Sequence, residues 1–121
     1  MKGEQVTILE RTNLFAIRII RLFTSLPKTT EAQVIGKQLL LSGTSVGAHT
    51  REGSRSRSDA EMISKTEGAL QELEETRYWL EILSDAGIIN AERLTDLINE
   101  ADALTAILVT SVKTIKARKN K

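Results

Sequence analysis

The chain has 121 residues, of which 40% are hydrophobic and 3% aromatic, with one proline and no cysteine. This length favours one domain over residues 1–121 with a core of its own. The lack of cysteine excludes disulfides and thiolate metal sites. Charged residues among the first eleven and the lack of an apolar run of membrane-spanning length lead us to expect a cytoplasmic protein without a membrane partner.

The net charge of +1 is the sum of three zones whose net charges alternate in sign along the chain. Residues 1–60 carry nine basic and five acidic side chains (+4), residues 61–102 carry three and eleven (−8), and residues 103–121 carry five and none (+5). Such zones place separate acidic and basic faces on a folded surface and favour head-to-tail self-association. Zoning alone does not identify a nucleic-acid-binding protein.

Apolar residues recur in alternating steps of four and three along residues 5–26, which predicts an amphipathic helix. Its stripe comprises Ile8, Thr12, Phe15, Ile19, Leu22 and Leu26. Pro27 ends this helix. A second helix is predicted over 30–52, beginning at Thr29 or Thr30 with a capping box closed by Gln33, and ending before a left-handed Gly53. Its stripe comprises Ala32, Ile35, Leu39, Ser42, Val46 and His49.

A third helix is predicted over 58–86, with Ser58 and Glu61 as a capping box and Gly87 as its terminator. Its seam comprises Ile63, Thr66, Leu70, Leu73, Arg77 and Leu80. Asn90 is expected to cap a fourth helix over 90–118, whose seam comprises Leu94, Leu97, Ala101, Leu104, Leu108 and Ile115. Four helices joined by short loops predict an all-α, antiparallel up-down-up-down four-helix bundle.

The second helix contains glycines, each of which costs roughly 1 kcal/mol in a helix relative to alanine. Gly43 and Gly47 are four residues apart, Gly36 lies one heptad earlier, and Ser45 extends the small surface. Such a surface allows close approach of another backbone. Two interpretations remain open: tight packing inside the bundle, or a contact between subunits.

His49 is the only histidine and lies on or beside the core seam. A structural, hydrogen-bonded histidine is favoured over a catalytic or metal-binding one because no second histidine or cysteine accompanies it. Its candidate partners are Glu52, Glu72 and Glu75. No Ser/His/Asp order, phosphate loop or zinc signature occurs. We therefore expect a non-enzymatic protein without a cofactor or metal.

Two groups of basic residues are candidates for contacts with RNA or DNA phosphates. The first comprises Arg51, Arg55, Arg57 and Lys65, and the second comprises Lys113, Lys116, Arg118, Lys119 and Lys121. Repeated around an oligomer, they would form a multivalent basic surface. In the alternative interpretation the loop arginines pair with Glu52, Asp59 and Glu61, and the C-terminal cations complement the helix dipole.

Tyr78 and Trp79 are adjacent on the third helix, so both cannot face the core. We expect one to pack and the other to lie at an edge or a subunit contact. Several glutamates nearby indicate a solvated acidic face; these are Glu72, Glu74, Glu75 and Glu81.

The segment QLLLSGTSVGAHTREGSRSRSDAEMISKTEGALQELEETRYWLEIL, with LPKT before it, resembles bacterial four-helix-bundle proteins related to those encoded in 23S rRNA intervening sequences. The accessory variability protein of diversity-generating retroelements belongs to the same group. The resemblance rests on Ser45, Val46, Ala48, Glu52, Gly53, Ser58, Lys65, Glu72, Glu75, Thr76, Tyr78, Trp79 and Leu80. His49 departs from the asparagine that is usual at this position.

The resemblance implies a bundle that assembles into a homopentameric ring. In the retroelement member, a basic surface of that ring is thought to engage nucleic acid and a reverse transcriptase. We therefore expect a homo-oligomer that binds nucleic-acid phosphates through the basic residues above. The alternative is a protein-interaction scaffold that binds a protein partner and no nucleic acid.

Overall fold

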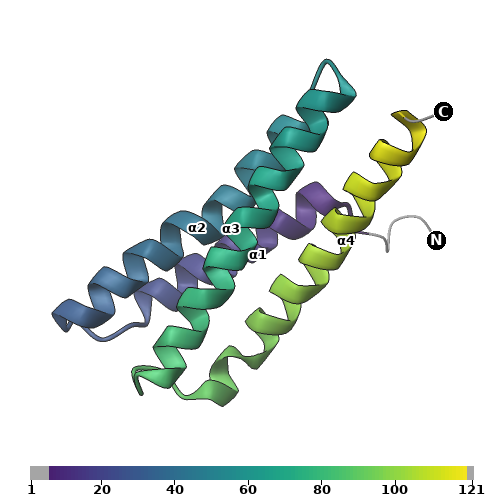
Figure 1. Cartoon of the computed structure of the whole chain (residues 1–121). Helices are drawn as coiled ribbons and strands as arrows, with labels where there is room; N and C mark the ends of the chain where they lie inside the picture. The colour runs from purple at the N-terminus through teal and green to yellow at the C-terminus, as the bar shows by residue number, and fades with distance from the viewer. Residues whose placement is uncertain (1–5, 120–121) are drawn as a thin grey trace.

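The computed structural model of the chain describes residues 6–119, with the backbone alone at position 119. It contains four long helices: α1 (Ile8–Thr24), α2 (Thr30–Ser54), α3 (Asp59–Asp85) and α4 (Thr95–Lys119), with a short 3-10 helix, η2 (Ala91–Leu94), before α4. Successive helices run in opposite directions, and no strand occurs in the described range (Figure 1). This confirms the all-α, up-down-up-down four-helix bundle.

Polar side chains cap the N-termini of the helices. Thr7 Oγ1 accepts a hydrogen bond from the Glu10 N–H, and the Glu10 carboxylate accepts the Thr7 N–H, which completes a capping box for α1. Ser58 Oγ accepts from the Glu61 N–H and so caps α3, as predicted. The Glu61 carboxylate, however, accepts from the N–H of Arg57 rather than that of Ser58.

The start of α2 differs from the predicted capping box. Thr29 is the N-cap, and its hydroxyl accepts from the Ala32 N–H. The Gln33 side chain donates to the Pro27 carbonyl at 2.9 Å instead of returning to the N-cap backbone. The amide thereby ties the proline connection to the first turn of α2.

Several helix ends differ from the sequence-based boundaries. Helix α1 begins at Ile8 and ends at Thr24, not at 5 and 26; residue 5 lies outside the described residues. Helix α2 continues through Gly53 to Ser54, so the prediction of a left-handed terminator there is wrong. Gly87, with φ of 74°, does terminate α3 in the left-handed conformation. Asn90 caps η2, and the α-helical hydrogen bonding of α4 begins only at Thr95.

The predicted stripes supply most of the core. The largest fully buried apolar side chains are Phe15, Ile19, Leu39, Leu73, Leu80, Leu83, Leu94, Leu104 and Val46. On α3 the buried stripe is shifted, because this helix packs against both α2 and α4. Thr76, which the predicted seam omits, is fully buried there, whereas Arg77 is partly exposed and pairs with Asp102 on α4 at 2.8 Å.

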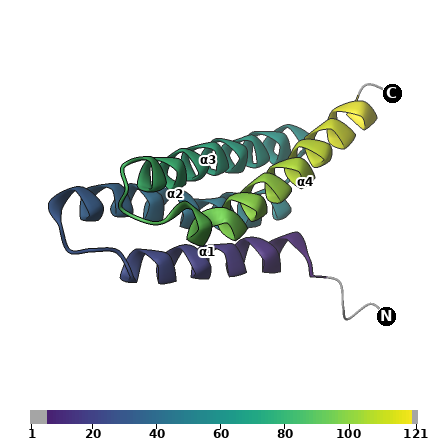
Figure 2. The same ribbon diagram turned by 90° about the horizontal axis from the view of Figure 1, so that it is seen from below.

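Helices α2 and α3 form a long central hairpin, with α1 packed against α2 and α4 against α3. Helix α1 and the C-terminal half of α4 diverge (Figure 2). Nearer the start of α4, an ion pair links that helix to α1: the Arg11 guanidinium donates two hydrogen bonds, of 2.7 and 2.9 Å, to the Glu100 carboxylate. These hydrogen bonds raise the pKa of Arg11 above its ordinary value. Among the described residues no helix has the length and apolarity needed to cross a membrane.

Candidate functional site

Three arginines lie at or next to the turn between α2 and α3. This turn is at one end of the bundle (Figure 1). Arg51 is in the last turns of α2, Arg55 is its C-cap, and Arg57 precedes the N-cap of α3. All three are exposed. No described carboxylate lies within ion-pair distance of their guanidinium groups. We call Arg51, Arg55 and Arg57 the turn arginines.

The carboxylates next to the turn arginines have other partners. Glu52 of α2 forms an ion pair with Lys65 of α3, with Glu52 Oε1 3.2 Å from Lys65 Nζ. Asp59 pairs with Arg118 of α4 at 2.9 Å, and Glu61 accepts the backbone N–H of Arg57. The interpretation in which the loop arginines pair with Glu52, Asp59 and Glu61 is therefore wrong. These arginines are left with their full charge facing solvent.

The other predicted basic residues are divided between paired and unpaired positions. Lys65 pairs with Glu52 as described above, and Lys116 pairs with Glu67 at 3.4 Å. The hydrogen bond from Arg118 to Asp59 raises the pKa of Arg118 above its ordinary value. Lys113 is exposed and has no ion-pair partner among the described residues. The side chain of Lys119 and the whole of Lys121 lie outside the described residues.

Three glycines of α2 lie on the side of α1: Gly36, Gly43 and Gly47. A Cβ added at Gly36 would lie 2.5 Å from Leu26 Cδ1, and one at Gly43 would lie 2.8 Å from Ile19 Cγ1. Gly47 faces Thr12 at a looser 3.5 Å. These contacts correspond to the first of the two interpretations, close packing inside the bundle. The Ser45 hydroxyl donates to the Leu41 carbonyl of its own helix.

The ring of His49 lies between two carboxylates without forming a hydrogen bond to either. Its Nδ1 is 3.9 Å from Glu52 Oε1, and its Nε2 is 3.8 Å from Glu72 Oε2, both too long for hydrogen bonds. Nδ1 is buried and has no hydrogen-bond partner among residues 6–119, and the ring packs against Gly68 of α3. The predicted hydrogen-bonded histidine is thus held by packing. Over the described residues, no group of three or more potential ligands could hold a metal ion.

Tyr78 and Trp79 divide as expected between surface and interior. Tyr78 is 52% exposed, and Trp79 is partly buried. Their rings meet edge to face with centroids 4.9 Å apart. A surface hollow of about 510 Å³ is lined by these two residues and by Gln71, Glu74 and Glu75. Glu75 therefore belongs to this hollow, whereas Glu72 is the glutamate of α3 beside His49.

A second surface was not recognised as a candidate from the sequence. It is a hollow of about 410 Å³ between α1 and α4, lined by Arg11, Leu14, Phe15, Ile17, Arg18, Arg21 and Glu100. Arg18 and Arg21 lie off the apolar stripe that the sequence predicts for residues 5–26. The overlooked signal was Leu14, an apolar residue that also falls off the stripe and is 53% exposed.

Comparison with protein families matches residues 4–110 to the family described as 23S rRNA-intervening sequence protein. Among solved structures, a protein with unknown function from the S23 ribosomal protein family of Bacteroides thetaiotaomicron VPI-5482 has a TM-score of 0.83 and 34% sequence identity. That match covers 88% of this chain and 99% of the other. No curated protein matches the chain. Since the family match extends over most of the sequence, the chain belongs to the 23S rRNA-intervening sequence protein family.

Proposed function

We propose that the chain is a non-enzymatic, homo-oligomeric helical bundle that binds RNA or DNA phosphates through Arg51, Arg55 and Arg57. One observation carries this proposal. The turn arginines are exposed and unpaired among the described residues, although three carboxylates lie within a few positions of them in the sequence. Those carboxylates are occupied by Lys65, by Arg118 and by a backbone amide.

Arginine is well suited to such contacts. Its planar guanidinium is charged at every physiological pH and presents a fork of N–H donors that matches two phosphate oxygens. A cation that already has a carboxylate partner must lose that partner before it binds a phosphate. Lys65, Lys116 and Arg118 therefore contribute less in this proposal, and exposed Lys113 extends the basic surface along α4.

The homo-oligomer, a pentamer by family resemblance, would convert a weak contact into a useful one. A single chain presents three turn arginines, and non-specific binding of this kind is weak at physiological salt. Repetition around a ring raises the effective concentration of the remaining sites after the first one binds.

The test is fluorescence anisotropy with labelled single-stranded RNA of mixed sequence, titrated over a series of salt concentrations. The turn variant replaces Arg51, Arg55 and Arg57 by Gln. The control variant replaces Lys28, Lys37 and Arg93 by Gln, which removes the same charge from exposed positions outside the turn. Wild type and control should bind at low salt, and the turn variant should bind at least tenfold more weakly.

The salt dependence gives a second readout. If each turn arginine neutralises one phosphate, its loss lowers the slope of log affinity against log salt by about 0.7, or about 2 for all three. No binding by the wild type at low salt, or equal weakening in both variants, would exclude the turn arginines as the binding site.

A protein-interaction scaffold is the second candidate. It is favoured by exposed aliphatic side chains on α2, where Val34 is 57% and Leu41 is 64% exposed. A partner bound there should survive nuclease treatment in a pull-down and should be retained by the turn variant. Loss of the partner after nuclease treatment, or in the turn variant, would favour nucleic-acid binding instead.

A further inference from the structure

We propose that the chain self-assembles head to tail. An acidic face of α3, formed by Glu74, Glu75 and Tyr78, contacts a basic face of α1, formed by Leu14, Arg18 and Arg21, on the next copy. The inference rests on the proposed homo-oligomer and specifies which surfaces of the chain meet.

The basic face of α1 has the composition of an uncovered contact. Leu14 is 53% exposed beside the hollow between α1 and α4. Arg18 and Arg21 line the same hollow, and neither has an ion-pair partner among the described residues. Arg11, one turn before Leu14, differs from them because Glu100 satisfies it with two hydrogen bonds. The face therefore presents an aliphatic side chain next to two uncompensated cations.

The acidic face of α3 carries the complementary groups. Glu74 and Glu75 are exposed and have no ion-pair partner in the part of the chain that the structure describes. Other glutamates of the same helix are paired: Glu67 with Lys116, and Glu81 with Arg77. Tyr78 lines the same hollow as Glu74 and Glu75, and its ring packs edge to face against Trp79. A restrained aromatic ring loses little conformational entropy on binding, which favours it as an anchor.

The two faces match in chemistry. Arginine forms charge-assisted hydrogen bonds with carboxylates and stacks on aromatic rings, so Arg18 and Arg21 can engage both the glutamates and Tyr78. Leu14 supplies apolar area beside them. Tyrosine and arginine are also enriched in protein–protein interfaces. A second copy is the natural occupant because one chain carries both faces, within sequence zones of opposite net charge.

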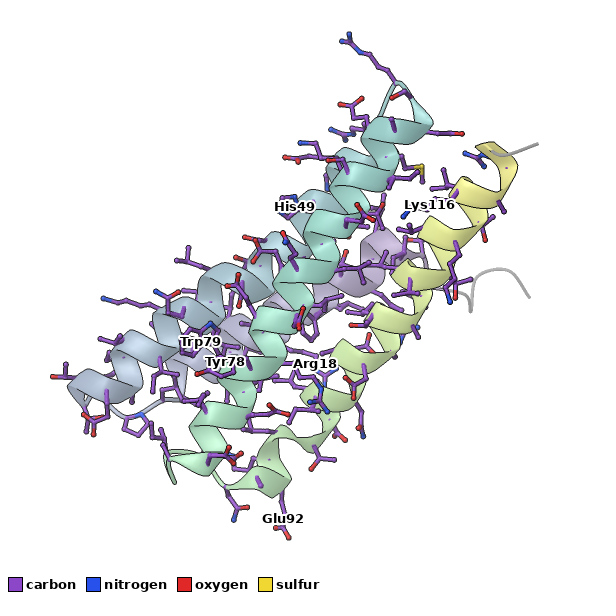
Figure 3. All side chains as sticks on the ribbon, viewed as in Figure 1. Arg18, His49, Tyr78, Trp79, Glu92 and Lys116 are labelled. Carbon is purple, nitrogen blue, oxygen red and sulfur yellow. The ribbon has the colours of Figure 1, made fainter. Side chains whose placement is uncertain are left out.

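The positions of the faces determine the type of assembly. Tyr78 and Trp79 lie on the part of α3 beside α2, whereas Arg18 lies nearer α4 (Figure 3). Because the two faces are separate, each copy uses one face toward the copy before it and the other toward the copy after it. Such a heterologous contact closes into a ring or continues as a filament.

Charge reversal tests this pairing in the full chain, with solution mass measured by light scattering after size exclusion. The α1 variant carries Arg18→Glu and Arg21→Glu, and the α3 variant carries Glu74→Arg and Glu75→Arg. Each should fall from the wild-type mass to the monomer mass. A combined variant with all four changes restores opposite charges on the two faces and should regain the wild-type mass.

The control variant carries Lys37→Glu and Arg93→Glu, two exposed positions on neither face. It should keep the wild-type mass, and helical circular dichroism should show that every variant folds. If the combined variant does not fold, an equimolar mixture of the α1 and α3 variants provides the same test. Contacts between unlike variants in that mixture are complementary, so the mixture should form assemblies larger than the monomer, whereas each variant alone should not.

The outcomes separate this inference from the proposed function. Wild-type mass in either reversal variant would overturn the α1–α3 pairing and leave the homo-oligomer standing. A combined variant and a mixture that both remain monomeric would overturn it as well. A wild type that is monomeric at all concentrations would overturn the homo-oligomer itself, and RNA binding by that monomer would still be measurable.

Discussion

The charges at the α2–α3 turn show why partners are hard to assign from sequence. Asp59 lies two residues from Arg57, yet its partner is Arg118, far away in the sequence and brought close by α4. Sequence proximity supported the interpretation in which the loop arginines pair with nearby carboxylates. The fold redistributes those carboxylates and leaves the turn arginines free to bind. The residues of the candidate site could thus be named from sequence, but their ionic state could not.

The glycines of α2 illustrate the same limit with packing instead of charge. The spacing of Gly43 and Gly47 indicated close approach of a neighbouring helix, and α1 is that neighbour. The spacing did not indicate that the two positions differ. At Gly43 the nearest atoms belong to the branched, fully buried Ile19, whereas Gly47 faces Thr12 at ordinary contact distance.

Alanine should therefore have opposite effects at these two positions. In Gly43→Ala the new methyl group would lie 2.8 and 2.9 Å from two carbons of Ile19, which cannot move away in the core. We expect the free energy of unfolding to fall by about 1–3 kcal/mol. In Gly47→Ala the methyl group fits, and the gain in helix propensity should raise it by up to about 1 kcal/mol.

Urea denaturation followed by circular dichroism measures both changes, at one protein concentration because assembly contributes to stability. The pair forms its own control, since both variants make the same substitution on the same helix. Equal effects at the two positions would show that α1 does not approach Gly43 more closely than Gly47.

At the scale of whole helices, the apolar stripes were predictable and the ends were not. The apolar stripes could be predicted because burial of one face contributes most of the stability of an amphipathic helix. The position of a helix end, in contrast, depends on the conformation of one or two residues. Gly53 and Gly87 carry the same signal in the sequence, but only Gly87 adopts a positive φ. Gly53 stays helical because it is buried against α3, with Lys65 and Thr66 facing it.

This difference leads to a prediction about the two helix ends. Gly53→Ala should raise the free energy of unfolding by about 0.5–1 kcal/mol, because an added Cβ meets its neighbours at 3.5 Å and alanine is the better helix former. Gly87→Ala should lower it by about 1 kcal/mol or more, because an L side chain is strained at φ of 74°. Thermal and urea unfolding would measure both.

A glycine that terminated α2 in the left-handed conformation would respond differently. Gly53→Ala would then destabilise the chain as Gly87→Ala does. The sign of the Gly53 effect therefore distinguishes the helical position in the structure from the terminator that the sequence suggested.

For the molecule as a whole, the two proposals use different parts of the bundle. The proposed contacts between copies lie along the flanks of α1 and α3, and the turn arginines lie at one end of the bundle (Figure 1). Neighbouring copies in a ring are related by rotation, so such flank contacts repeat the turn at equivalent positions. Assembly and phosphate binding should therefore be coupled without sharing a residue.

Two variants distinguish an effect of assembly on RNA binding from an effect of net charge. The α1 variant (Arg18→Glu, Arg21→Glu) makes each chain more acidic, and the α3 variant (Glu74→Arg, Glu75→Arg) makes each chain more basic. If binding followed net charge, the α3 variant would bind RNA more tightly than the wild type. If binding depends on several turns acting together, both variants should bind 10²-fold or more weakly than the wild type, within the range that multivalency typically supplies.

The combined variant has the wild-type net charge and should recover both the wild-type mass and the affinity for single-stranded RNA. Anisotropy titrations at matched salt would measure all four proteins, and the dissociated variants should also show a shallower salt dependence because fewer phosphates are contacted at once. Tighter binding by a monomeric α3 variant would show that charge, and not the ring, determines affinity. Weak binding by both monomers would instead mean that the turn arginines function only when assembly brings several turns together.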